Sequence, residues 1–160
     1  MFQLRYHPIQ EQIKALAKQL NQPTIQLSYR GNRDQAYFTT WKGNLEKSGG
    51  ILAAIGIHLF DLLFLNFGGI QEIIHLENGV KNSTGKINLE NATVEWDFEF
   101  VTKEKIPVSR TFRINEHQLD IGSYANNLHS VAYQEILNGN GIDLQSVKEG
   151  IKLLNTVFTL

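Results

Sequence analysis

Residues 48–69, SGGILAAIGIHLFDLLFLNFGG, decide the fold of this chain, because the rest of the sequence is organised around them. Apolar residues lie on all sides of the helix that this run would form, which is typical of a helix buried in the protein. Ser48 can cap the start of the helix, and Gly68 with Gly69 supplies the left-handed stop expected after its end. The run therefore predicts one buried helix.

Two ionisable side chains, His58 and Asp61, lie within this apolar run. Buried charge is costly unless it has a partner, so both residues require an explanation. They are three residues apart and share a helical face, with Ala54 one turn earlier. His58 is either a catalytic residue or a hydrogen-bonded core histidine, and Asp61 either orients His58 or caps a nearby loop. The spacing also fits two ligands of a metal site, but the sequence suggests no third ligand.

The composition is that of an ordinary globular protein, with 42% hydrophobic and 19% charged residues. The length predicts a single domain, 1–160, with a core of its own. A net charge of −1 gives no reason to expect nucleic acid as a partner. A membrane span is disfavoured because the apolar run holds two ionisable groups and no basic cluster flanks it. The absence of cysteine and of an apolar signal segment in MFQLRYHP predicts a cytoplasmic protein.

The rest of the chain reads as short strands with a few helices. We expect strands at residues 2–6, 24–29, 36–41, 70–76, 86–89, 93–100, 108–114 and 118–121, and helices at residues 8–20 and 127–137 and after Asp143. The segments 24–29 and 36–41 are predicted to form an antiparallel pair. Because helices do not alternate one for one with strands, the fold class is α+β: a large, mainly antiparallel open sheet with helices packed on one face.

The strand predicted at residues 93–100 shows the clearest alternation in the chain. Val94, Trp96, Phe98 and Phe100 fall on one side, whereas the other side is acidic or polar. Helices would cover one face of the sheet and leave the other open. An open face with Trp96 or its neighbours exposed would favour pairing of two sheets, so we expect a homo-oligomer that forms through this face.

Several further residues could bind a ligand. Lys42 and Arg5, predicted at strand ends, could bind a carboxylate or phosphate, or could be solvated surface charges. Tyr37, Trp41 and Tyr124 could stack on a ring or could serve only the structure. The sequence contains no Gly-x-Gly-x-x-Gly motif, no phosphate-binding loop and no nucleophile elbow.

Five short motifs carry a resemblance to a known family. They are WKGN at 41–44, KSGG at 47–50, IGIHLFDLL at 55–63, QLRYHP at 3–8 and YQEILNGNG at 133–141. Together they resemble the C-terminal domain of the Gfo/Idh/MocA oxidoreductases and, within that family, the bacterial UDP-N-acetylglucosaminuronate 3-dehydrogenases of surface-polysaccharide biosynthesis. The resemblance covers nearly the whole chain, but Ala54 stands where the family usually has Asn or Asp.

The resemblance implies a two-domain enzyme in which an N-terminal Rossmann domain binds NAD and the C-terminal domain shapes the sugar site and mediates oligomerisation. It implies that His58 lies beside the sugar carbon that is oxidised, while a lysine of the Rossmann domain completes the site. We therefore expect a nucleotide sugar as substrate, His58 as the catalytic residue, and no activity from this chain alone, since the Rossmann domain is absent. The alternative is a non-catalytic dimerisation or sugar-binding module derived from the same fold. The predicted substrate-binding residues are Arg5, Trp41, Lys42, Gly49, Gly50, Asp61 and Tyr124.

Overall fold

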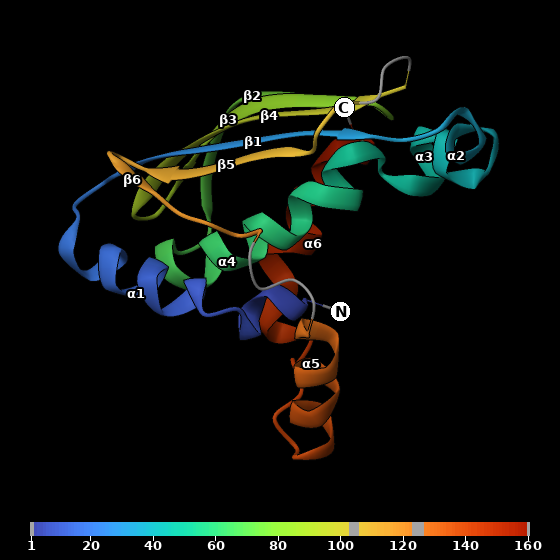
Figure 1. Cartoon of the computed structure of the whole chain (residues 1–160). Coiled ribbons are helices and arrows are strands. Elements are labelled where there is room, and N and C mark those ends of the chain that lie inside the picture. The colour runs from blue at the N-terminus through green and yellow to red at the C-terminus, as the bar shows by residue number, and fades with distance from the viewer. Residues whose placement is uncertain (1, 103–105, 123–126, 160) are drawn as a thin grey trace.

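The computed structural model describes residues 2–102, 106–122 and 127–159 and has two layers, a twisted sheet and a group of helices beneath it (Figure 1). The strands are β1 (Thr24–Asn32), β2 (Ile70–Asn78), β3 (Asn82–Leu89), β4 (Ala92–Val101), β5 (Ser109–Ile114) and β6 (His117–Gln118). The helices are α1 (Ile9–Gln19), α2 (Gln35–Thr39), α3 (Leu45–Ser48), α4 (Ile57–Phe67), α5 (Leu128–Leu137) and α6 (Lys148–Thr159). Short 3-10 turns are η1 (Gln3–Tyr6), η2 (Trp41–Gly43) and η4 (Gln145–Val147).

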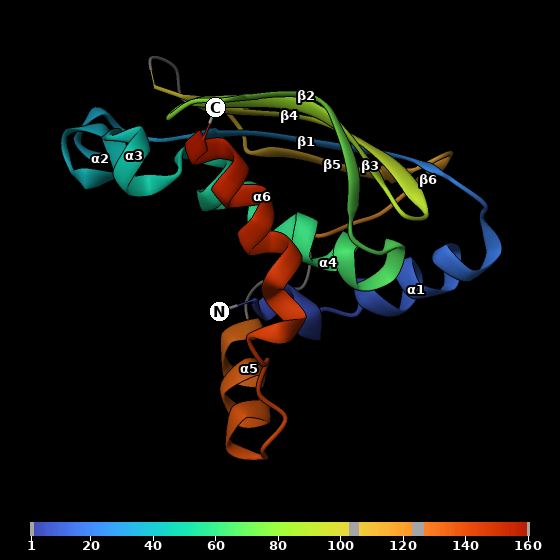
Figure 2. The ribbon, with the colours of Figure 1, turned by 180° about the vertical axis from the view of Figure 1, so that it is seen from behind.

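The described strands form one sheet in the order β2-β3-β4-β1-β5-β6. Only the β1–β4 pair is parallel; the other four pairs are antiparallel. Seen from behind, the sheet still has α1, α4 and α6 on one side, while the opposite face carries no helix (Figure 2). The expected α+β class, with a mainly antiparallel open sheet, is therefore confirmed.

Two predicted strands are wrong. Residues 2–6 contain the 3-10 turn η1 instead of a strand, and residues 36–41 belong to α2 and η2. Asp34 starts α2 by accepting a hydrogen bond from the Tyr37 N–H at 2.9 Å. No place beside β1 is left for residues 36–41, because β4 pairs with one edge of β1 and β5 with the other.

The predicted central helix is present, with one break and one irregular turn. Gly49 and Gly50 both have positive φ angles, of 70° and 66°, and separate α3 from the main helix. The Ser48 hydroxyl accepts a hydrogen bond from the Gly50 N–H at 3.1 Å, so Ser48 caps the turn between the two helices. A π-helical segment, Leu52–Gly56 (η3), then leads into α4, which ends at Gly68 with φ 85° as expected. Such π segments occur frequently at functional sites, and this one ends at Gly56, two residues before His58.

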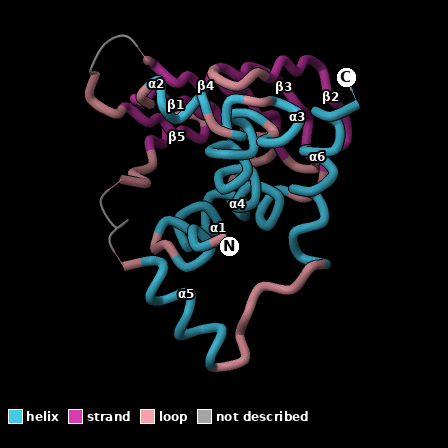
Figure 3. The backbone as a smooth tube through the Cα atoms, turned by 90° about the vertical axis from the view of Figure 1, so that its right-hand side faces the viewer, coloured by secondary structure: helices cyan, strands magenta, loops and turns pink. Residues whose placement is uncertain are grey.

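The central helix lies under the sheet in the core. The helical stretch Leu45–Phe67 is long and apolar enough to cross a membrane by composition, but most of its apolar window is buried inside the protein. Phe60 is fully buried, and its ring meets the Trp96 ring edge-on at a centroid distance of 5.1 Å. Figure 3 shows the helices gathered below the sheet with α5 extending away from it. The stretch is thus the core helix of this fold.

The open face of the sheet is polar instead of aromatic. Trp96 is only 4% exposed, since it points to the helix side and its indole N–H donates to the Ser83 hydroxyl at 2.9 Å. Ion pairs lie across the strands on the open face: Arg30–Glu99 at 2.8 Å and Lys86–Glu95 at 2.7 Å. The predicted alternation of β4 is confirmed, but the exposed aromatic patch that would favour pairing of two sheets is not found here.

Candidate functional site

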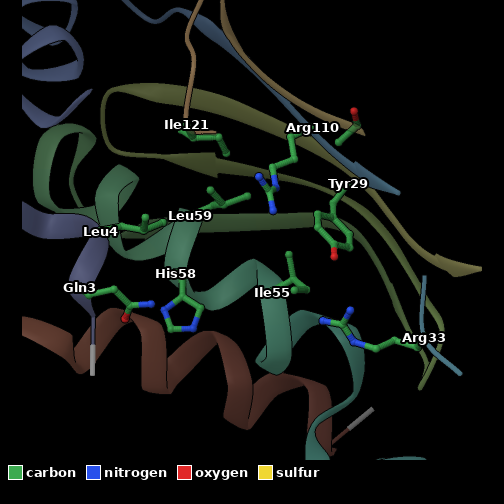
Figure 4. A pocket seen from close by; sticks show the side chains of 10 residues that line it. Gln3, Leu4, Tyr29, Arg33, Ile55, His58, Leu59, Arg110 and Ile121 are labelled. Carbon is green, nitrogen blue, oxygen red and sulfur yellow. The ribbon is translucent and has the colours of Figure 1, made fainter. Parts of the chain in front are cut away.

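His58 lines a cavity of about 250 Å³ between the central helix and one half of the sheet (Figure 4). The η1 turn forms one wall, β1 and β5 form the roof, and the end of η3 with the start of α4 forms the floor. The lining residues are Gln3, Leu4, Ser28, Tyr29, Arg33, Ile55, His58, Leu59, Arg110 and Ile121. The cavity therefore brings a titratable ring, two guanidinium groups and several apolar side chains into one space.

The imidazole of His58 is partly buried. Its Nδ1 is inaccessible to solvent and forms no hydrogen bond with the described residues, and its ring meets that of Phe2 edge-on at 5.9 Å. Burial lowers the pKa of His58 below its ordinary value of 6.5, an effect that the Asp61 carboxylate opposes. The ring is consequently neutral at pH 7. A neutral imidazole can accept a proton from a bound hydroxyl group.

Asp61 forms an ion pair with Arg5. The Arg5 Nε and Nη2 donate to the two Asp61 carboxylate oxygens at 2.7 and 2.6 Å, and the side chains are 11% and 3% exposed. Arg5 also donates to the hydroxyl and the carbonyl oxygen of Ser146, both at 2.8 Å. These contacts join η1, α4 and η4, and neither Arg5 nor Asp61 lines the His58 cavity. The structure thus places both predicted substrate-binding residues in a buried clamp between helices.

Trp41, Lys42 and Gly50 line a second cavity of about 250 Å³. The Lys42 ammonium lies 4.9 Å from the centre of the Tyr37 ring and 5.9 Å from that of Trp41, which is 59% exposed. The remaining lining residues are Tyr37, Ser48, Ala53, Ala54 and Val80. The site predicted from sequence is therefore divided between two cavities.

The other predicted residues have different positions. Gly49 lies beside this second cavity, where an added Cβ would come within 2.7 Å of the Ala53 methyl group. Tyr124 lies outside the described residues. Ala54 and His58 are one turn apart, and each lines a different cavity.

Sequence reasoning missed Arg33 and Arg110 as residues of the site. Arg33 follows β1, in a segment interpreted as a hairpin loop, and Arg110 lies in β5. No pattern of residue spacing in the sequence links Arg33 with Arg110, because the two side chains line the same cavity only once β1 has paired with β5. Among the described residues, no cluster of His, Asp or Glu could hold a metal ion.

The chain belongs to the Gfo/Idh/MocA oxidoreductases, since the model of the oxidoreductase family C-terminal alpha/beta domain matches residues 18–122. It is similar to the WlbA (WbpB) dehydrogenase of Thermus thermophilus, whose structure was solved in complex with NAD and UDP-GlcNAcA. The identity is 27%, the TM-score is 0.86, and the match covers 99% of this chain and 54% of that one. A second structure of that dehydrogenase, with NAD and alpha-ketoglutarate, gives a TM-score of 0.88 at 27% identity, with 100% of this chain and 55% of that chain covered.

The fold also matches the WlbA dehydrogenase of Bordetella pertussis, with a TM-score of 0.69. The identity is 15%, and the match covers 97% of this chain and 58% of that one, so it supports the fold alone. The chain spans about half the length of the dehydrogenases it matches.

Proposed function

We propose that this chain is the substrate-binding and oligomerisation domain of an NAD-dependent nucleotide-sugar oxidoreductase, a UDP-N-acetylglucosaminuronate 3-dehydrogenase that oxidises the sugar C3 hydroxyl. The observation that carries this proposal is the His58 cavity, in which a partly buried imidazole with a lowered pKa faces a space on the helix side of the sheet. The likeness to a dehydrogenase solved with NAD and UDP-GlcNAcA supports the choice of substrate.

His58 would act as the proton acceptor. With the sugar in the cavity and its C3 hydroxyl against the imidazole, the neutral ring would take the hydroxyl proton. NAD, when bound in the complete enzyme, would accept the C3 hydrogen as hydride. The apolar lining, which includes Leu59 and Ile55, excludes water around the reacting carbon. The helix fixes the ring, because His58 follows directly on residues packed in the core. The chain's own part is thus to place the sugar and to hold the proton.

The described residues do not fit a dinucleotide. The sequence has no Gly-x-Gly-x-x-Gly motif, and β1 leads into α2 through Arg33 and Asp34, without the glycines that let a backbone approach a pyrophosphate. We therefore propose that NAD is held by a separate nucleotide-binding domain, and that the second cavity, with Trp41 and Lys42 at its mouth, contacts another part of the nucleotide sugar.

The test is a turnover assay on the complete dehydrogenase that contains this domain. We expect UDP-GlcNAcA to reduce NAD, with formation of NADH and of a product that has lost two hydrogen atoms from the sugar. Binding of UDP-GlcNAcA without any NADH formation would instead support the alternative of a sugar-binding module. Ala54 favours that alternative, because its methyl group offers no polar contact beside the second cavity.

We further propose that the protein forms a homo-oligomer through the open face of the sheet. Exposed ion pairs such as Arg30–Glu99 make this face suitable for a polar contact between copies. Sedimentation equilibrium at micromolar protein concentration is expected to show a dimer or larger species that dissociates as the salt concentration rises. A strict monomer would reject this part of the proposal. A cytoplasmic location stays a prediction.

A further inference from the structure

We propose that Arg5 and Phe2 are positioning residues for His58. The ion pair of Arg5 with Asp61 sets the turn η1 on the central helix, and the Phe2 ring then holds the imidazole in place. This inference rests on the proposed function for its effect on turnover, whereas the contacts themselves stand apart from it. The observations that carry it are an imidazole without a hydrogen bond, matched contacts between η1 and α4, and the way in which Arg5 is anchored.

The imidazole of His58 is not oriented by a hydrogen bond. Neither ring nitrogen bonds to a described residue, and Nδ1 is inaccessible to solvent. A catalytic histidine is usually oriented by a third group that bonds to its other nitrogen. Asp61 is the carboxylate closest to His58 in the sequence, but its two oxygens accept from Arg5 and not from the imidazole. Packing must therefore supply the orientation of the ring.

Two pairs of side chains meet between η1 and α4. His58 and Asp61 are three residues apart on α4 and share a helical face. Phe2 and Arg5 are three residues apart across the 3-10 turn, where side chains at this spacing eclipse each other, and the Arg5 N–H donates to the Phe2 carbonyl at 3.1 Å.

Each member of the first pair contacts one member of the second. The Phe2 ring meets the His58 ring edge-on at 5.9 Å. The Arg5 guanidinium meets both oxygens of Asp61 at 2.7 and 2.6 Å. Because the turn and the helix each fix the spacing of their own pair, the ion pair at one position places the ring contact at the other.

The Arg5 guanidinium is itself anchored on three sides. Besides its bonds to Asp61, it donates to the hydroxyl and the carbonyl oxygen of Ser146, both at 2.8 Å. Its carbon lies 5.8 Å from the centre of the Phe2 ring, the same ring that contacts the imidazole. Ser146 is held in turn, because its N–H donates to the Asp143 carboxylate at 2.7 Å. Only a planar fork of donors can make these contacts together, so lysine cannot replace Arg5 here.

The same turn forms part of the cavity wall. Gln3 and Leu4 lie between Phe2 and Arg5 along η1, and both line the cavity together with His58 (Figure 4). A shift of η1 on the helix would therefore move this wall as well as the imidazole. Arg5 should consequently affect both sugar binding and proton transfer, whereas Phe2 should affect mainly proton transfer.

NMR of the 160-residue chain tests the contact itself. We expect a nuclear Overhauser effect between the ring protons of Phe2 and the imidazole protons of His58. Arg5→Lys keeps the positive charge but loses the fork, so this effect should disappear. Tyr6→Phe is the matched control, because it removes a hydrogen bond of the same turn, to the Asn140 carbonyl at 3.2 Å, and should leave the effect unchanged.

Turnover by the complete dehydrogenase tests the consequence. Phe2→Leu removes the ring but retains an apolar side chain and the ion pair. We expect it to lower kcat about tenfold, since a misplacement of about 1 Å can cost up to about a hundredfold, and to change KM less. Arg5→Lys should lower kcat and also raise KM, because the cavity wall moves with the imidazole. Tyr6→Phe should match the wild type.

The possible outcomes separate this inference from the proposed function. A wild-type chain without the Overhauser effect, or an Arg5→Lys chain that retains it, would overturn the positioning role. If Arg5→Lys did not fold, Phe2→Leu would decide, and an unchanged kcat would overturn the role of the ring. A complete enzyme that forms no NADH would reject the dehydrogenase, while the NMR comparison would still show whether Arg5 places the imidazole.

Discussion

Replacing Arg5 by alanine is expected to lower the free energy of unfolding by about 3–5 kcal/mol, the usual cost of leaving one member of a buried ion pair without its partner. Asp61 is 2% exposed, and both of its oxygens accept from Arg5. Without the guanidinium, the carboxylate must stay charged in an apolar setting or take up a proton. The loss of both bonds to Ser146 would also loosen η1 from η4.

Urea denaturation followed by circular dichroism measures this effect. Arg30→Ala is the matched control, because its partner Glu99 is 43% exposed and exposed pairs contribute only about 0–1 kcal/mol. The double variant Arg5→Met, Asp61→Leu removes both charges and is expected to regain most of the lost stability. If Arg5→Ala were as stable as Arg30→Ala, the clamp between η1 and α4 would have no energetic role.

The second large effect is on catalysis. In the complete dehydrogenase, His58→Gln is expected to lower kcat by about a hundredfold or more, within the range that a positioned acid–base group contributes. The substitution retains a polar side chain of similar size, so substrate binding should change less than turnover. His75→Gln is the control, because His75 lies exposed on β2, away from the cavity. Unchanged turnover in His58→Gln would make His58 a structural residue.

The pH dependence of the wild-type enzyme gives an independent readout of the same group. Burial lowers the pKa of His58, so the neutral, proton-accepting form persists to a pH below 6.5. As the pH falls through that lowered pKa, the ring takes a proton and kcat/KM should decline. His58→Gln is expected to lose this acidic limb. An acidic limb that persists unchanged in the variant would assign the titration to another group.

Local sequence patterns were sufficient for the core of the fold. The length and apolar character of residues 48–69 predicted the central helix and its end at Gly68, and the alternation at residues 93–100 predicted β4, because each signal lies within one continuous segment. The failure at residues 36–41 has a non-local cause. Thr-rich and aromatic residues favour a strand, but a strand needs a free neighbour, and both edges of β1 are occupied.

The candidate site was predictable only in part, because several of its contacts join residues that are far apart in the sequence. His58 was identifiable because a titratable group in an apolar helix is conspicuous within one segment. The pairing of Arg5 with Asp61 joins residues 56 positions apart, so spacing on the helix suggested His58 as the partner of Asp61 instead. Arg33 and Arg110 reach one cavity through strand pairing, which no local pattern of charged residues encodes.

The central claim is that a nucleotide sugar binds with its reacting hydroxyl against His58, and imidazole NMR of the complete dehydrogenase tests it most directly. Titration with UDP-GlcNAcA is expected to shift the His58 resonances in proportion to site occupancy and to leave those of His75 unchanged. UDP-GlcNAcA that binds or is turned over while the His58 resonances stay where they were would contradict the account.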